Sequence, residues 1–177
     1  MAKRPHVMDL YQLDGRVAMV TGGARNLGLD MAEALAEAGA QVAITSRDPD
    51  KARSVADTIA GATNKTVRAY RLDVTDEHQI VGVVAQVIKD FGALDILVNN
   101  AGNVQNSAPL EQRKLDDWNY TFATNSTGTF LCAREAAKHM IERKTGAIIN
   151  IASISGMIGK ERSVYEGTDM VGVTIDY

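Results

Sequence analysis

The sequence contains 177 residues, of which 45% are hydrophobic and 23% are charged, the composition of an ordinary globular protein. A formal net charge of −3 gives no reason to expect nucleic acid or an anionic membrane as a partner. No stretch approaches the roughly 20 apolar residues that span a bilayer, and the basic N-terminus is not followed by the apolar segment of a secretory signal. The one cysteine, Cys132, excludes an internal disulfide framework and favours a reducing compartment. We therefore expect a single cytoplasmic domain, residues 1–177.

Short apolar runs alternate with segments of helical periodicity from Arg16 onward, which is the pattern of a parallel sheet covered by helices. Continuous apolarity in these runs favours strands buried on both faces; they lie at 17–20, 42–44, 94–98 and 147–151. Residues 66–72 alternate instead, so this strand is predicted at a sheet edge. The expected order is β-α-β-α-β-α-β-α-α-β: an α/β, doubly wound parallel sheet of Rossmann type that stops after its fifth strand.

Helical spacing of apolar residues predicts the intervening helices. The first carries Leu27, Met31, Ala34, Leu35 and Ala38. The clearest apolar stripe in the sequence consists of Ile80, Val83, Val84, Val87, Ile88 and Phe91, and Asp76 is placed to cap the start of that helix. A longer helix is expected from about residue 125 to 143, with Phe130, Leu131, Ala137 and Ile141 along it. Cys132 on this helix is expected to be a buried structural thiol.

A glycine-rich segment follows the first apolar run and opens the first helix. It consists of Thr21, Gly22, Gly23, Ala24, Arg25, Asn26, Leu27 and Gly28. Such a turn lets backbone N–H groups approach a pyrophosphate at the positive end of a helix. A lone turn of this kind could equally be a tight connection that binds nothing.

A second motif, Asn99-Asn100-Ala101-Gly102, directly follows a later apolar run. The two motifs together resemble the short-chain dehydrogenase/reductase family, and the resemblance extends from about Leu13 to the end of the sequence. The sequence as a whole is most similar to those of sugar-acid and polyol dehydrogenases and 3-oxoacyl reductases. One departure from the family's T-G-x(3)-G-x-G pattern is Asn26 in place of the middle glycine. Asn tolerates the left-handed conformation, so we expect the turn to be preserved.

The resemblance implies a nicotinamide cofactor, and the end of the second strand indicates which one. A carboxylate there would bind the ribose 2′-hydroxyl of NAD, whereas a basic residue accommodates the 2′-phosphate of NADP. The sequence has Ser46 and Arg47 at this point, and relatives place a residue such as Arg25 near the same phosphate. A single arginine in a loop is more often a solvated charge, but two at matched positions favour NADP over NAD.

Further residues match cofactor positions of the family. Asp73 and Val74 match the position that holds the adenine ring. Asn100, Ala101 and Gly102 match the motif that lies under the cofactor, and Asn100 is expected to contact it.

The family's catalytic residues are a tyrosine that acts as general acid/base, a lysine that lowers its pKa, a serine that hydrogen-bonds the substrate carbonyl and an asparagine that supports a water relay. Asn125 matches the asparagine and Ser153 the serine, with Ser155 the weaker alternative. The resemblance therefore implies hydride transfer between the cofactor and a small-molecule carbonyl or alcohol. A homo-oligomeric full-length relative is implied as well.

The catalytic tyrosine has two candidates. Tyr165 follows Ser153 at close to the family spacing, but the Y-x-x-x-K pattern would then need a lysine where Asp169 stands. Tyr177 would need its lysine four residues further on, beyond the last residue. An acid at the lysine position opposes phenolate formation, so we predict Tyr177. Bringing a tyrosine pKa from about 10 toward 7 requires about 4 kcal/mol of differential stabilisation, which the missing lysine would supply.

Other readings of the chain remain open at this point. It could be a non-catalytic nucleotide-binding module, or an inactive truncated fragment that folds poorly because 147–151 is left as an apolar edge. Trp118 and Tyr120 lie near the expected substrate cleft, although core packing is the expected role for both. The three histidines are dispersed without ligand spacing, so no metal site is predicted.

Overall fold

A five-stranded parallel sheet forms the centre of the protein in the computed structural model, which describes residues 6–103, 106, 108, 110–154, 157 and 167. The strands are β1 (Val17–Val20), β2 (Gln41–Ser46), β3 (Val67–Arg71), β4 (Ile96–Asn99) and β5 (Ala147–Asn150), in the order β3-β2-β1-β4-β5. All neighbouring pairs are parallel. The predicted doubly wound α/β fold is confirmed, and the alternating strand β3 lies at a sheet edge as predicted.

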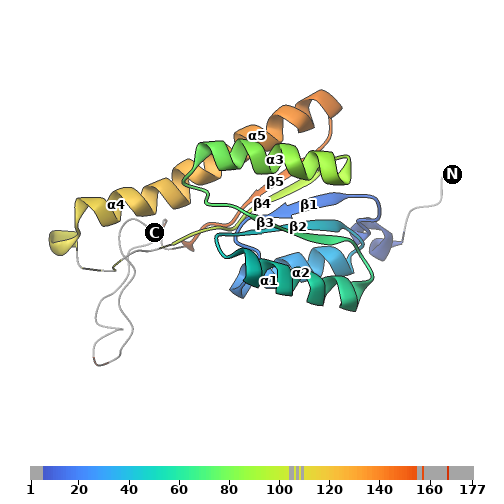
Figure 1. The fold of residues 1–177 in the computed structure, drawn as a ribbon, viewed down its shortest axis with the longest axis horizontal. Helices are drawn as coiled ribbons and strands as arrows, with labels where there is room; N and C mark the ends of the chain where they lie inside the picture. Colours follow the sequence, from blue (N-terminus) through green and yellow to red (C-terminus); the bar gives the residue numbers. More distant parts are fainter. Residues whose placement is uncertain are drawn as a thin grey trace.

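Helices cover both faces of the sheet (Figure 1). They are α1 (Asn26–Glu37), α2 (Pro49–Thr63), α3 (Glu77–Phe91), α4 (Leu115–Phe122) and α5 (Thr129–Arg143), with 3-10 turns η1 (Val7–Tyr11) and η2 (Leu110–Gln112). α1 and α2 pack on one face, where Ala18 and Val20 of β1 point. α3 and α5 pack on the other, where Val17 and Met19 point. Alternate residues of one buried strand therefore serve two hydrophobic cores.

α4 and α5 belong to one helical rod that extends beyond the sheet (Figure 1). They are joined by a π-helical segment, η3 (Ala123–Gly128), in which the backbone hydrogen bonds span one residue more than in an α-helix. Such segments are rare, and they occur often at functional sites. The predicted candidate Asn125 lies inside η3.

The predicted stripe of α1 is only partly confirmed. Met31 and Leu35 pack against the core, but the fully buried residues are Gly28, Ala32 and Ala36, and Leu27 is 64% exposed. Small residues at the centre of the packing face let the helix lie close to its neighbours, so the periodicity predicted the helix correctly but not the centre of its buried face. In α3 the predicted stripe is confirmed, since Ile80, Val84 and Val87 are buried and Asp76 caps the helix start.

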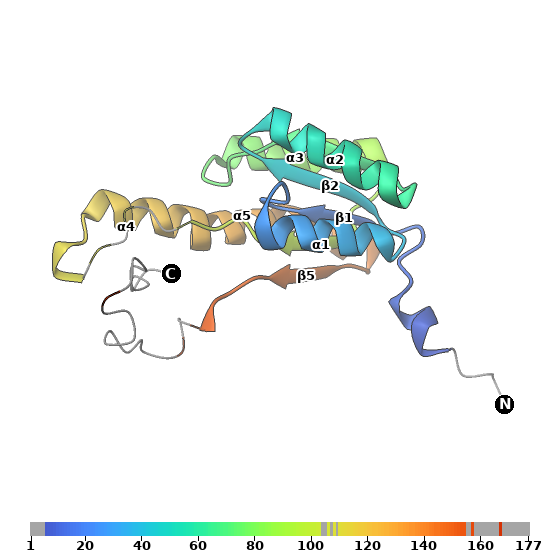
Figure 2. The ribbon, with the colours of Figure 1, turned by 90° about the horizontal axis from the view of Figure 1, so that it is seen from below.

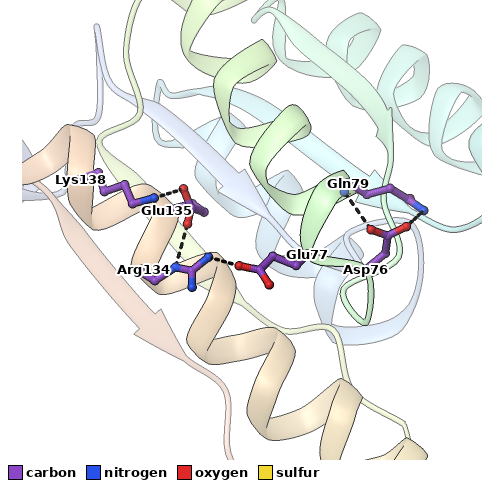
Figure 3. A network of polar contacts seen from close by, with 6 residues as sticks. All are labelled: Asp76, Glu77, Gln79, Arg134, Glu135 and Lys138. Atoms are coloured by element: carbon purple, nitrogen blue, oxygen red, sulfur yellow. Dashed lines mark hydrogen bonds and ion pairs between the residues drawn. The ribbon is translucent and has the colours of Figure 1, made fainter.

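Polar contacts fix α5 against its neighbours. Arg134 of α5 pairs with Glu77 at the start of α3, at 2.6 Å, and with the buried Glu135, whose other oxygen accepts from Lys138 (Figure 3). At the far end of α5, Arg143 pairs at 3.0 Å with Asp95 just before β4. Cys132 of α5 is fully buried in the hydrophobic core, as predicted.

The two edge strands of the sheet differ in how far other elements cover them. β3 contacts α2, whereas all four residues of β5 are exposed, and Figure 2 shows β5 along the open edge. Along the outer side of α5, Phe130 is 60% and Ile141 is 73% exposed. Among the described residues, no helix is long and apolar enough to cross a bilayer.

Candidate cofactor and active site

A cavity of about 740 Å³ opens at the carboxyl ends of the strands. It lies where the chain reverses direction across the sheet, because β1 is followed by β2 on one side and paired with β4 on the other. Ligands of doubly wound sheets bind in the crevice at this switch point. The cavity is also of the size of ordinary small-molecule sites.

Most sequence-predicted site residues line this cavity. They are Gly22, Ala24, Arg25, Asn26, Leu27, Gly28, Ser46, Arg47, Asp73, Val74, Asn100, Ala101, Gly102, Asn125 and Ser153. Thr21 and Gly23 are buried beneath it, where they hold the backbone of the turn. Tyr177 and its rival Tyr165 lie outside the described residues, as do Ser155 and Asp169.

The glycine-rich turn needs two residues in the left-handed region. Gly22 has φ +66° and Asn26 has φ +48°. The expectation that Asn26 preserves the turn is thereby confirmed. Gly28 meets a different demand, because a Cβ atom there would collide with the carbonyl oxygen of Gly22 and the side-chain amide of Asn100.

Thr21 and Asn100 bind the turn to the end of β4. The backbone N–H groups of Asn100 and Ala101 both donate to Thr21 Oγ1, each at 3.0 Å. The side-chain amide of Asn100 donates in return to the Thr21 carbonyl at 2.9 Å. Asn100 therefore lines the cavity while its amide hydrogens hold the backbone of the turn.

The N-terminus of α1 points its free N–H groups at the turn. Its N-cap residue, Arg25, provides no side-chain hydrogen bond, whereas Asp48 and Asp76 cap α2 and α3 by accepting from the backbone of Lys51 and Gln79. The first N–H groups of a helix have no partner inside the helix, so those of α1 remain available to an anion.

Three cations and two carboxylates surround the end of the cavity beyond β2. The cations are Arg25, Arg47 and Lys51, and the carboxylates are Asp48 and Asp73. Arg25 makes no ion pair or hydrogen bond with its guanidinium within the described part of the chain. Arg47 donates from Nη1 to the hydroxyl oxygen of Tyr120 on α4, at 2.5 Å. The expectation that Tyr120 packs in the core is wrong, because its half-buried ring lines the cavity.

The loop with Asp73 and Val74 is fixed from two sides. The backbone N–H of Asp73 donates to Gln79 Oε1 at 3.1 Å, and Gln79 is itself held by Asp76 (Figure 3). Hydrogen bonds from the backbone and side chain of Gln79 keep the pKa of Asp76 below its usual value. On the other side Gly128 of η3 lies against Val74, so closely that a Cβ atom at Gly128 would be 2.6 Å from the Val74 carbonyl oxygen.

Asn125 and Ser153 also line the cavity. The Asn125 side chain accepts from the backbone N–H of Asn103 at 2.8 Å and donates to its carbonyl at 3.0 Å. Asn125 therefore anchors the backbone that follows β4. The half-buried Ser153 follows β5 and also lines the cavity.

Sequence reasoning missed several residues of the cavity wall. Tyr120, Lys51, Asn103 and Thr124 all line it. The hydrogen bond between Tyr120 and Arg47 joins positions 73 residues apart, so no local sequence pattern could predict it. On α4 the polar residues Asp117 and Thr121 are buried, whereas Tyr120 is half-buried and lines the cavity.

A glycine-rich turn, an uncapped helix N-terminus and a crevice at the switch point define a dinucleotide-binding α/β protein. Comparison with known sequences is more specific. The sequence model of short chain dehydrogenases matches residues 16–168, and the chain belongs to this family of oxidoreductases. Gluconate 5-dehydrogenase of Gluconobacter oxydans is 37% identical over 152 residues, which are 86% of this chain and 59% of that enzyme. The chain thus spans about three-fifths of the length of the relatives it matches.

Solved structures agree with the sequence comparison. A gluconate 5-dehydrogenase from Burkholderia cenocepacia, in complex with NADP and tartrate, matches with a TM-score of 0.82 and 38% identity, over 88% of this chain and 60% of that one. An NAD⁺-bound xylitol dehydrogenase matches with a TM-score of 0.80 and 32% identity, over 87% of this chain and 59% of that one. Members of the family with similar backbones therefore differ in cofactor.

Proposed function

We propose that this chain binds NADP(H) and contributes the cofactor site of an oxidoreductase that transfers a hydride between the nicotinamide and a small carbonyl or alcohol. The observation that carries the proposal is the cavity at the switch point, with the uncapped α1 N-terminus beneath it and Arg25 and Arg47 at one end. The names of the relatives make sugar acids and polyols the first substrates to test. Homo-oligomeric assembly of the whole protein is part of the proposal.

The residues present fit a dinucleotide. The turn from Gly22 to Gly28 leaves no room for a Cβ atom at Gly28, so its shape depends on that glycine. A diphosphate would accept from the free N–H groups at the start of α1, where the helix dipole also favours negative charge. Asp73 and Val74 would hold the adenine, and Asn100, Ala101 and Gly102 would lie under the cofactor.

The preference for NADP over NAD rests on charge. Ser46 ends β2 where a carboxylate would serve NAD, and the nearby Asp48 is engaged in capping α2. Arg47 and Arg25 offer guanidinium groups, whose planar donors match phosphate oxygens. The NADP complex of the similar gluconate 5-dehydrogenase supports this choice, and the NAD⁺-bound xylitol dehydrogenase makes a direct test necessary.

The chemistry of the reaction follows from the family. The bound nicotinamide supplies or accepts the hydride. The Ser153 hydroxyl would donate a hydrogen bond to the substrate oxygen, and the Tyr177 hydroxyl would exchange a proton with that oxygen. Asn125 would act from the π-helical segment by fixing the backbone at Asn103, which borders the same cavity.

The cofactor preference can be tested by titrating the protein with NADPH and NADH in a calorimeter. Arg47→Asp should weaken NADPH binding by about 10- to 100-fold, because a hydrogen bond to a charged group contributes about 1.5–3 kcal/mol. NADH binding should be retained or improved. Arg53→Asp makes the same change of charge on the exposed side of α2, away from the cavity, and should leave both affinities unchanged. Equal affinities for the two cofactors before and after Arg47→Asp would refute the preference.

The proposed proton donor needs a separate test in a chain that carries the lysine four residues after Tyr177. Tyr177→Phe should abolish NADPH-dependent carbonyl reduction and leave NADPH binding intact. Tyr165→Phe should have a far smaller effect on the rate. The reverse result would transfer the role to Tyr165. Cofactor binding without reduction of any carbonyl substrate by the same lysine-containing chain with both tyrosines intact would favour a nucleotide-binding module instead.

A further inference from the structure

The hydrogen bond between Arg47 and Tyr120 joins two elements that are far apart in the sequence. Arg47 directly follows β2, and Tyr120 lies on α4, which extends beyond the sheet (Figure 1). Both side chains line the same cavity, at the end where the cations gather. The pair therefore spans the cavity between its β2 side and its α4 side.

α4 holds Tyr120 in place by contacts of its own. Asp117 and Thr121, on either side of Tyr120, are buried. Asp117 accepts from the side chain of Asn106 at 2.8 Å, and Thr121 accepts from Arg113 at 2.9 Å. The Tyr120 carbonyl accepts from Thr124 at 3.0 Å. A tyrosine on such a fixed helix loses little further freedom when it holds an arginine.

The donor and acceptor capacity of the pair leaves it open to a ligand. A guanidinium has five N–H donors, and the contact with Tyr120 uses a donor of Nη1. The Tyr120 hydroxyl oxygen accepts from Arg47, so its own proton remains to be donated. An arginine and a hydroxyl that lie side by side in one cavity, each with a donor left, suit a phosphate monoester. The cations Arg25, Arg47 and Lys51 outnumber the carboxylates Asp48 and Asp73 in the cavity lining, which also favours an anionic group.

We propose that Tyr120 is a cofactor-specificity residue, which holds Arg47 in place and donates its hydroxyl proton to the 2′-phosphate of NADP(H). The inference rests on the proposed function, because it concerns the same cavity and the same cofactor. It adds a contact from α4 to a recognition that otherwise depends on β2 and the glycine-rich turn. A tyrosine that only stabilised α4 would affect NADPH and NADH alike.

The test measures binding of NADPH, NADH, adenosine 2′,5′-bisphosphate and 5′-AMP to the chain by calorimetry. Tyr120→Phe should weaken binding of the two 2′-phosphorylated probes by about tenfold, the usual effect of losing a hydrogen bond to a charged group. Binding of NADH and 5′-AMP should change less than twofold. The matched control is Tyr70→Phe, which removes the hydroxyl that donates to Asp90 at 2.9 Å in a different groove and should not alter any of the four affinities.

Two failures can be told apart. If the unaltered chain binds NADPH no better than NADH, the proposed cofactor preference is wrong. If it prefers NADPH and Tyr120→Phe keeps that preference, only the role of Tyr120 is refuted. Equal weakening of all four probes by Tyr120→Phe would likewise refute the specificity role. In the Arg47→Ala background, the Tyr120→Phe change should weaken NADPH binding less than in the parent, because the part that acts through Arg47 is already absent and only the direct hydrogen bond remains to be lost.

Discussion

Gly128 is the residue at which the π-helical segment meets the loop of Asp73 and Val74, so replacing it with alanine tests how the two sides of the cavity depend on each other. A Cβ atom at Gly128 would lie 2.6 Å from the carbonyl oxygen of Val74 and 3.0 Å from its Cβ atom. Favourable contacts between such atoms are at about 3.5–4.0 Å. The obstacle is backbone, which cannot move aside by changing a rotamer.

The loop is also prevented from retreating. Asp73 donates its N–H to Gln79, and its carboxylate accepts from Thr75 at 3.0 Å and 2.8 Å. The clash would therefore push η3 outward together with Asn125. Overpacking of this kind costs about 1–3 kcal/mol, against a helix-propensity gain of about 1 kcal/mol for replacing glycine with alanine.

We expect Gly128→Ala to lower the free energy of unfolding by up to about 2 kcal/mol, and each kcal/mol lowers Tm by about 2–4 °C in a chain of this size. It should also weaken NADPH binding, since Val74 borders the cavity. Gly82→Ala is the matched control, because Gly82 lies in α3 and a Cβ atom there meets nothing within 4 Å. That variant should be as stable as the parent, or more so. Thermal unfolding measures the Tm of both variants, and titration measures their affinity for NADPH. A Gly128→Ala protein with the same Tm and NADPH affinity as Gly82→Ala would refute the reasoning.

The remaining predictions concern α5. Hydrogen bonds from Lys138 and Arg134 hold the pKa of Glu135 below its usual value, so its contribution to stability is present above that value and is lost as pH falls through the folded-state pKa. Glu135→Gln should thus lower Tm at pH 7, and the difference in Tm from the parent should shrink below about pH 4. Glu142→Gln, on the exposed side of α5, is the control and should show neither effect. A difference that grew toward acid pH would contradict this sign. Burial raises the pKa of Cys132 to about 12, so iodoacetamide at pH 8 should label the native protein far more slowly than the urea-unfolded chain. Equal labelling rates, followed by mass spectrometry, would show that the thiol is accessible.

The sequence predicted the order of strands and helices well because buried parallel strands leave a simple signal. Val17–Val20 and its equivalents are continuous apolar runs, and the alternation at Val67–Arg71 correctly marked an edge. The buried face of α1 was only partly predictable from its bulky residues, because Met31 and Leu35 pack against the core but Gly28, Ala32 and Ala36 form the centre of that face. Close approach to the sheet at Gly28 selects small residues, while Leu27 is left exposed.

The parts of the candidate site that consist of local sequence motifs were predictable. The contacts between residues far apart in the sequence were not. The turn from Gly22 to Gly28 and the residues after β4 form local patterns, and they line one cavity. Tyr120 of α4 reaches Arg47, 73 residues earlier in the sequence, only through the tertiary fold. The π-helical segment that contains Asn125, and the close contact of its Gly128 with Val74, were not predictable from helical periodicity.

The strand order divides the sheet into two wings that the chain builds one after the other. β1, β2 and β3 are neighbours made from the first 71 residues, whereas β4 and β5 add to the opposite side of β1. A nucleotide in the cavity would touch both wings, since Gly22 and Arg47 belong to the earlier one and Asn100 and Ser153 to the later one. Its binding energy would then oppose separation along the seam between β1 and β4, because a ligand that binds only the joined form stabilises that form by mass action. Amide hydrogens that pair β1 with β4 should accordingly be those whose exchange with solvent slows most when the nucleotide is added.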